Sequence, residues 1–240
     1  MRKKLQRFSD NARHRNIIEP DQASHAPLKG KWRTEYFNNQ NDLVVELGCG
    51  KGAYTLGLAQ QFPHKNFVGV DIKGDRLWVG SSYALTQQLH QVAFLRTRIE
   101  QLGQCFAPGE ISELYIPFPD PRPRGRDEKR RLTSPRFLAL YRKLLQPGGF
   151  VHFKTDDNAL FAYTLAVLRE QTVSSLVYTE DLYQSEWITA QHGIQTAYEQ
   201  RFLAQGATIQ YIRFAFATRH PTKKTTEENN CIVQYNSVKE

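Results

Sequence analysis

The sequence predicts an α/β fold: a doubly wound, mostly parallel, Rossmann-like sheet with helices on both faces. Two observations carry this prediction. Short apolar segments alternate with segments whose apolar residues recur at helical spacing, a pattern typical of parallel sheets. A glycine-rich turn, residues 48–52, directly follows the first strong strand segment. In such sheets ligands bind at the carboxyl ends of the strands, so function is expected there.

The predicted elements follow one another from residue 42 onward. Strands are predicted over 42–47, 66–71, 92–95, 112–118 and 150–154. Helices are predicted over 53–62, 76–89, 135–145 and 159–169. Thr133-Ser134-Pro135 predicts the start of the third helix, because Ser favours the N-cap and Pro the first helical position. A further strand, helix and strand are expected to end near residue 218.

The composition indicates one large folded domain. Of the 240 residues, 40% are hydrophobic and 12% aromatic, which excludes a chain that is disordered throughout. Apolar runs stay well short of the roughly 18 residues of a membrane helix, and the first twenty residues lack a signal-peptide core. Three widely spaced cysteines fit neither a disulfide framework nor a zinc cluster. We expect a cytoplasmic monomer or weak homodimer, without a membrane or metal partner.

The net charge of +8 is concentrated in two segments. Residues 1–33 and residues 120–143 each carry nine Lys or Arg against three acids. Such clusters indicate a nucleic-acid partner, although each alone also fits a solvated face. We expect a basic, partly flexible N-terminal arm over 1–40, one folded domain over 41–218 and a polar C-terminal tail over 219–240.

Two acids flank the glycine turn Gly48-Cys49-Gly50-Lys51-Gly52: Glu46 precedes it, and Asp71 ends the next strand. Glycines let the backbone approach a ligand closely, and an acid about 20 residues further on accepts hydrogen bonds from ribose hydroxyls. The turn also satisfies a relaxed dinucleotide fingerprint, and a turn without a ligand remains an alternative. Cys49 is interpreted as structural, because no base accompanies it.

Charge favours one cofactor over the other. A nicotinamide dinucleotide would place its pyrophosphate over the turn, where the carboxylate of Glu46 would repel it. S-adenosylmethionine brings a sulfonium and an ammonium group instead, which the same carboxylate attracts. The sequence therefore favours S-adenosylmethionine, with Glu46, Gly48, Gly50 and Asp71 as its binding residues.

Alternating prolines surround Asp120 at the end of the fourth predicted strand. Pro119, Pro121 and Pro123 restrict the backbone, so Asp120 is expected to be presented rigidly. Five arginines and one lysine follow within eleven residues. Their positive charges would attract a phosphate to the neighbourhood of Asp120. A charged loop without function remains an alternative. The Asp-Pro pair is loosely similar to the signature of amino-group methyltransferases, but Arg122 stands where that signature has a second proline.

Four motifs carry a more specific resemblance. They are Phe118-Pro-Asp-Pro-Arg-Pro-Arg with Lys129-Arg-Arg-Leu-Thr133, Pro147-Gly-Gly, His152-Phe-Lys-Thr-Asp156, and Thr196-Ala-Tyr-Glu199 with Arg201-Phe202. In this order and spacing they resemble the bacterial tRNA (guanine-N7-)-methyltransferase family, over about residues 43–216. The resemblance implies methyl transfer from S-adenosylmethionine to N7 of the guanine at tRNA position 46.

The resemblance also implies site residues. Glu46, Asp71 and Asp120 would contact the cofactor, and Asp120 would also be the carboxylate of the catalytic site. The residues implied to contact the guanosine are Arg124, Asp156, Thr196 and Glu199. The family's Trp after Asp-Pro is Arg122 here, and its His ahead of Lys-Arg-Arg is Asp127. The acid expected to meet the adenine is replaced by Arg98, so we expect the backbone near Ile99 to hold the adenine.

The residues fit this chemistry. Guanine N7 carries a lone pair and no proton, so its methylation needs alignment and excluded water rather than a general base. The product is cationic, and carboxylates near the base would stabilise it. Thr196 and Glu199 also have the spacing of a capping box. An amino-group RNA methyltransferase and a non-catalytic RNA-binding protein on the same fold remain alternatives.

Overall fold

The computed structural model describes residues 11, 14–20, 27–217 and 232–234. Its core is one sheet with the strand order β1-β4-β3-β2-β5-β6-β8-β7-β9. The strands are β1 Ile17–Ile18, β2 Leu43–Leu47, β3 Asn66–Asp71, β4 Val92–Arg96, β5 Ile111–Pro117, β6 Leu145–Thr155, β7 Val173–Thr179, β8 Gln210–Phe216 and β9 Ile232–Gln234. All neighbouring strands are parallel except β8, which runs antiparallel to both β6 and β7. The predicted doubly wound, mostly parallel sheet is confirmed.

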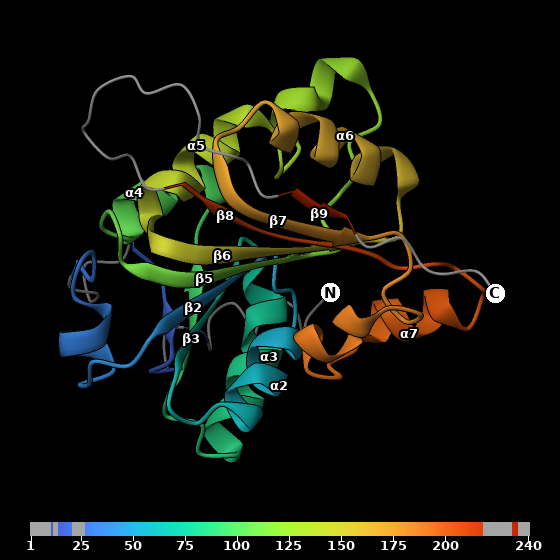
Figure 1. Cartoon of the computed structure of the whole chain (residues 1–240). Coiled ribbons are helices and arrows are strands. Elements are labelled where there is room, and N and C mark those ends of the chain that lie inside the picture. The colour runs from blue at the N-terminus through green and yellow to red at the C-terminus, as the bar shows by residue number, and fades with distance from the viewer. Residues whose placement is uncertain (1–10, 12–13, 21–26, 218–231, 235–240) are drawn as a thin grey trace, which may run out of the picture.

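Helices cover both faces of the sheet. They are α2 Ala53–Gln61, α3 Gly74–Thr86, α4 Leu102–Cys105, α5 Pro135–Leu144, α6 Asn158–Arg169 and α7 Ala197–Leu203, with short helical turns η2 Trp32–Tyr36, η3 Ile99–Gln101, η4 Gly125–Arg130 and η5 Glu186–Gln191. In Figure 1, α4, α5 and α6 lie above the sheet, and α2 and α3 lie below it. Each side has its own hydrophobic core. No described helix is long and apolar enough to cross a membrane.

Helices α5 and α6 begin at residues that favour a helix N-terminus. Pro135 is the first residue of α5 and follows Ser134 at the N-cap position, as expected, although the Ser134 side chain makes no capping bond. Asp157 caps α6 by accepting from the backbone N of Leu160 at 2.7 Å. The Asp157 carboxylate therefore serves as the N-cap of α6, and the neighbouring Asp156 is not part of this cap.

The N-terminal residues that the structure describes pack on the domain. Ile17 and Ile18 pair with Phe94 and Leu95 as edge strand β1. Trp32 is 1% exposed, and its indole Nε1 donates to the Cys105 carbonyl at 2.9 Å. The sequence missed these contacts because the segment shows no periodicity. The expected arm over 1–40 therefore contributes a strand and a core tryptophan, while residues 1–10, 12–13 and 21–26 of it lie outside the described residues.

The C-terminal residues 232–234 also pack on the domain. Residues 232–234 form β9, which pairs with β7 at the edge of the sheet. Residues 219–231 and 235–240, which make up most of the expected polar tail, lie outside the described residues, as does residue 218 at the end of the expected domain.

We expect Trp32→Ala to lower the free energy of unfolding by about 3–5 kcal/mol, because it removes a fully buried aromatic side chain and leaves a cavity. Urea denaturation measures this change. Tyr83→Ala is the control, since that side chain is 45% exposed, and should cost under about 1 kcal/mol. A similarly small cost for Trp32→Ala would show that the N-terminal segment does not pack as described.

Candidate functional site

The predicted site residues follow strands that end at one edge of the sheet. Glu46, Asp71 and Asp120 lie at or after the carboxyl ends of β2, β3 and β5, which are parallel and adjacent. Asp156 directly follows β6, the next strand in the order. This edge is where ligands bind in open parallel sheets.

The glycine turn forms a cradle at the end of β2. Gly48 and Gly50 have φ of 69° and 57°, in the left-handed region that favours glycine. A Cβ built at either position would meet nothing within 4 Å. The backbone there is open to a ligand, as the sequence predicted for a cofactor turn.

Glu46 lies beneath this turn, 4% exposed. Its Oε2 accepts from the backbone N of Thr55 at 2.8 Å and from the Thr55 hydroxyl. Burial raises the pKa of Glu46 to about 7, against the lowering effect of the Thr55 hydrogen bonds. The expectation that Glu46 flanks the glycine turn is therefore corrected in one respect, because its carboxylate is enclosed and bonded to the start of α2.

This arrangement bears on the choice of cofactor. In dinucleotide-binding folds the pyrophosphate sits at the N-terminus of the first helix and accepts from its free backbone N–H groups. Here Glu46 already accepts from the N–H of Thr55 in the first turn of α2. A phosphate would meet a carboxylate in place of that donor, whereas a cation would be attracted.

Asp71 is the second acid at the turn. Its Oδ2 accepts from the backbone N of Gly50 at 2.9 Å, and its Oδ1 accepts from that of Lys73 at 2.9 Å. Burial, and after it the charges of Glu46 and Asp71, raises the pKa of the Cys49 thiol well above its usual value. The buried thiol is thus kept neutral, which agrees with the structural role expected for Cys49.

Arg98 and Ile99 occupy the position where an adenine-contacting acid was expected. Arg98 is exposed and precedes the turn η3, while Ile99 is half-buried against the core. An acid does lie at this end of β4, because Glu19 follows β1 and pairs with Arg96 at 3.1 Å. The part that Ile99 would play in holding an adenine stays a prediction.

The loop after β5 holds Asp120 in a constrained backbone. Phe118 and Arg122 have φ of 50° and 48°, which is unusual for residues other than glycine. Asp120 accepts from the backbone N of Arg122 at 3.1 Å and pairs with its Nε at 3.1 Å. The Asp120 side chain is 60% exposed. Strained backbone around an exposed acid is typical of functional sites, which fits the rigid presentation inferred from the prolines.

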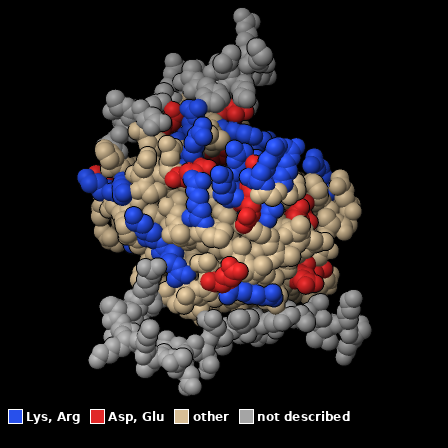
Figure 2. Space-filling model, turned by 90° about the horizontal axis from the view of Figure 1, so that it is seen from above, with Lys and Arg blue, Asp and Glu red and all other residues tan. Residues whose placement is uncertain are grey.

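A basic surface continues from this loop. Six residues line one hollow in it: Arg122, Arg124, Arg126, Asp127, Lys129 and Arg130. Figure 2 looks down on the molecule from the top of Figure 1 and shows Lys and Arg gathered on this face, with acidic side chains between them. Arg124 is exposed, so it is open to an anionic partner.

Asp156 and α7 meet beside the Asp120 loop. The Tyr198 hydroxyl donates to Asp156 Oδ2 at 3.2 Å, and the Tyr198 ring lies 5.3 Å from that of Phe118. Thr196 caps α7 by accepting from the backbone N of Glu199, which returns the bond through its side chain. The predicted capping box is confirmed, and three of the family-like motifs converge in space.

Glu199 is enclosed rather than open to a ligand. Its side chain is 0% exposed and pairs with Lys154, which is 3% exposed. Its Oε1 also accepts from the Tyr183 hydroxyl at 2.8 Å. The expectation that Glu199 contacts a guanosine is not met in this arrangement, because the carboxylate faces the interior.

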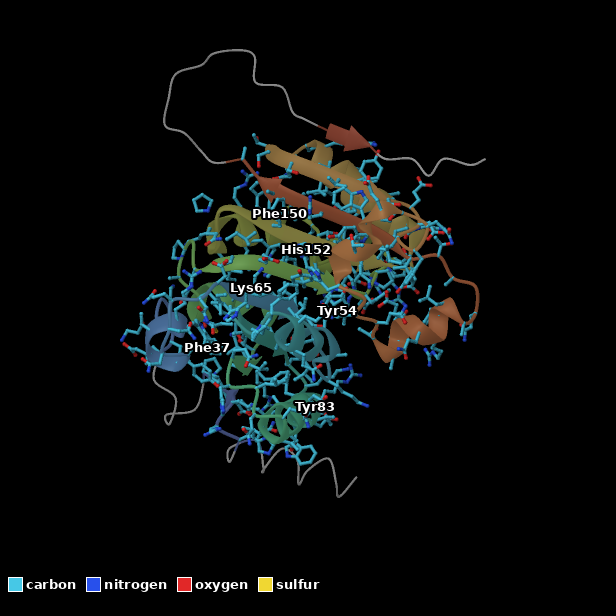
Figure 3. All side chains as sticks on the ribbon, turned by 60° about the horizontal axis from the view of Figure 1, so that its bottom comes forward. Phe37, Tyr54, Lys65, Tyr83, Phe150 and His152 are labelled. Atoms are coloured by element: carbon cyan, nitrogen blue, oxygen red, sulfur yellow. The ribbon has the colours of Figure 1, made fainter. Side chains whose placement is uncertain are left out.

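Sequence reasoning missed Lys154 and His152 as individual side chains. Both lie on the same face of β6 as Phe150, because side chains two residues apart in a strand share a face. Figure 3 shows Phe150 and His152 on the face that Tyr54 of α2 approaches. His152 stacks on Tyr115 with ring centroids 4.3 Å apart, and burial lowers the pKa of His152 to about 3, so it is neutral. A lysine at an inward strand position was the available signal, since buried lysines require an acidic partner.

Among the described residues, no group of three or more His, Cys, Asp or Glu side chains could hold a metal ion.

Comparison with known proteins identifies relatives over most of the chain. Residues 40–212 match a family model described as a putative methyltransferase. The chain is 47% identical to the tRNA (guanine-N(7)-)-methyltransferase of Cytophaga hutchinsonii, over 90% of this chain and 98% of that one. It is 44% identical to the protein of the same name from Bacteroides fragilis, over 88% of this chain and 84% of the relative.

A solved structure with the same fold is more distant in sequence. The 16S rRNA methyltransferase KamB aligns with a TM-score of 0.56 at 16% identity, over 79% of this chain and 92% of that one. This likeness concerns the fold alone. The sequence relatives are far closer, and the chain belongs to the tRNA (guanine-N7-)-methyltransferase family.

Proposed function

We infer that this protein is an enzyme that transfers a methyl group from S-adenosylmethionine to N7 of a guanine in tRNA; the resemblance points to position 46. The observation that carries the proposal is the convergence of Asp120, Asp156 and α7 beside the acid-flanked glycine turn. The family membership supports the same activity. tRNA is accordingly the proposed partner, and the cytoplasm the proposed location.

The cofactor would lie against the glycine turn. Gly48 and Gly50 leave the space, Asp71 offers a carboxylate for the ribose hydroxyls, and Glu46 contributes negative charge from below. When bound, S-adenosylmethionine supplies an electrophilic methyl group on a sulfonium. The adenine would lie near Ile99.

Asp120 and Asp156 would face the guanine. Carboxylates accept hydrogen bonds from guanine N1 and the exocyclic amine, and they stabilise the positive charge that develops on the purine as N7 is methylated. Thr196 begins α7 next to them. No general base is required, because N7 carries no proton.

Arg124 and the basic surface around it would hold the tRNA backbone. Exposed arginines bind phosphate oxygens through bidentate hydrogen bonds and release counterions from the nucleic acid. The surface begins immediately after Asp120, so a bound tRNA would bring its bases to the site.

The direct test is product analysis. Undermodified bulk tRNA is incubated with the protein and labelled S-adenosylmethionine, and the digested nucleosides are separated. We expect label in 7-methylguanosine. Label in a nucleoside methylated on an exocyclic amine would favour the amino-group methyltransferase, and tRNA binding without S-adenosylmethionine binding would favour the non-catalytic RNA-binding protein.

We expect Asp120→Asn to lower the single-turnover methylation rate by about 100- to 1000-fold, because it removes one stabilising charge without changing the size of the side chain. Filter binding should find tRNA affinity within a few-fold of the wild type. Glu170→Ala, on an exposed residue after α6, is the control and should retain full activity. A methylation rate for Asp120→Asn within threefold of the wild type would exclude the proposed role.

We expect Arg124→Ala with Arg126→Ala to weaken tRNA binding and to reduce the slope of log affinity against log salt, by about one unit for each phosphate that the variant no longer neutralises. Filter binding at several salt concentrations measures both. The control is Arg169→Ala, which removes an exposed arginine at the end of α6 and should leave the slope unchanged. An unaltered slope in the double variant would contradict the assignment of this surface.

We expect the binding of S-adenosylmethionine near pH 7 to release roughly half a proton, because Glu46 with a pKa of about 7 is then partly protonated and a nearby cation favours its ionised form. The release should fade above about pH 8.5, where Glu46 is already ionised. Calorimetry in two buffers of different ionisation enthalpy measures it. Glu46→Gln should abolish the release, and Glu100→Gln should not; equal release in Glu46→Gln would refute the coupling.

A further inference from the structure

Lys154 contacts three segments that surround the proposed guanine site. Its Nζ donates to the Tyr54 hydroxyl of α2 at 3.3 Å and pairs with Glu199 of α7. The same ammonium lies 5.4 Å from the ring centroid of Phe118, two residues before Asp120. The backbone of Lys154 adds a fourth contact, because its carbonyl accepts from the N of Phe118 at 2.8 Å.

The partners of Lys154 belong to the two halves of the site. Tyr54 is the second residue of α2, the helix that starts at the glycine turn. Phe118 and Glu199 belong to the loop that carries Asp120 and to the helix that carries Tyr198. Lys154 therefore links the cofactor side of the site to the guanine side through direct contacts.

The pair of Lys154 and Glu199 is enclosed. Their side chains are 3% and 0% exposed, and Glu199 Oε2 also accepts from the backbone N of Thr196 at 3.3 Å. A buried ion pair contributes little net stability compared with apolar residues of the same volume, but it fixes geometry where its hydrogen bonds are satisfied. Such a pair is better suited to setting the position of α7 than to stabilising the fold.

We propose that Lys154 and Glu199 are positioning residues that dock α7 against the end of β6 and thereby align the guanine with the methyl donor. This inference rests on the proposed function. It assigns Glu199 an indirect role, through the placement of Tyr198 and Asp156, in place of a direct contact with the base. Lys154 transfers no proton, because N7 has none to lose.

Alignment is the main source of rate in such a reaction. A displacement of about 1 Å between reacting atoms costs on the order of 100-fold in rate, even when both ligands still bind. Loss of the pair should therefore lower the chemical rate, while the basic surface still binds tRNA and the glycine turn still binds the cofactor.

The double variant Lys154→Met with Glu199→Gln tests this inference, because it removes the pair without leaving one unpaired buried charge. We expect its single-turnover methylation rate to fall by about 100-fold. The dissociation constants for tRNA and for S-adenosylhomocysteine, measured by filter binding and calorimetry, should stay within about threefold of the wild type. A rate within threefold of the wild type in the folded double variant would overturn the inference.

Lys65→Met with Glu113→Gln is the matched control. This pair also joins a lysine and a glutamate, near the amino ends of β3 and β5, with side chains 31% and 22% exposed. It contacts neither α7 nor the Asp120 loop in any described bond. The control should methylate tRNA at the wild-type rate. An equal loss of rate in both double variants would show a general effect of disturbing the sheet and would count against the proposal.

Tyr54→Phe keeps the inference testable if the double variant does not fold. It removes the Tyr54 hydroxyl, which accepts from Lys154, and leaves the pair with Glu199 in place. We expect a rate several-fold below the wild type with unchanged binding of S-adenosylhomocysteine. A wild-type rate would contradict the link to α2. The wild-type protein distinguishes the proposed function from the positioning role. If it forms no 7-methylguanosine, the proposed function fails. Normal product in the wild type, together with an unaffected double variant, refutes only the positioning role.

Discussion

The hydrogen bonds from Thr55 to the buried carboxylate of Glu46 set the chemistry of the glycine turn. They place an acid at the N-terminus of α2, where related folds bind a phosphate, and they occupy a backbone donor that a phosphate would need. The open backbone at Gly48 and Gly50 also lies against Asp71, whose carboxylate accepts from the N of Gly50. A cationic ligand suits this cradle, and the identity of the cofactor follows from that electrostatic constraint.

The edge of the sheet that carries Asp120 and Asp156 depends on a second enclosed acid. Glu199 turns inward to Lys154, so the carboxylates left near the surface are Asp120 and Asp156. Both buried acids shape backbone: Glu46 fixes the start of α2, and Glu199 fixes the start of α7. Asp120 and Asp156 therefore lie at an edge of the sheet next to two helices, α2 and α7, whose first turns are fixed by the buried acids.

Much of the fold and of the site could be predicted from the sequence. The strands β2 to β6 show strong apolar runs, and the glycine turn, the prolines and the capping box have local sequence signatures. As predicted, Asp71 ends a strand, Asp120 follows a strand and Thr196 caps a helix. Edge strands β1 and β9 were missed, because two or three residues carry no periodicity. Trp32 gave no local sign of its contact with Cys105, which is 73 residues away.

The inward direction of Glu46 and Glu199 also escaped prediction. Spacing shows which residues follow a strand, but it does not show whether a carboxylate turns to solvent or to a partner distant in sequence. Lys154 and Glu199 are separated by 45 residues, and Glu199 lies on α7, which connects β7 to β8. Their pairing therefore depends on how these two strands are placed beside β6. Only the assembled sheet brings them together.

The selection of a cationic ligand by the glycine turn is tested most directly by calorimetric titration of the protein with S-adenosylmethionine and, separately, with NAD. The account predicts saturable binding of S-adenosylmethionine and no detectable binding of the dinucleotide. Saturable binding of NAD, with none of S-adenosylmethionine, would contradict it.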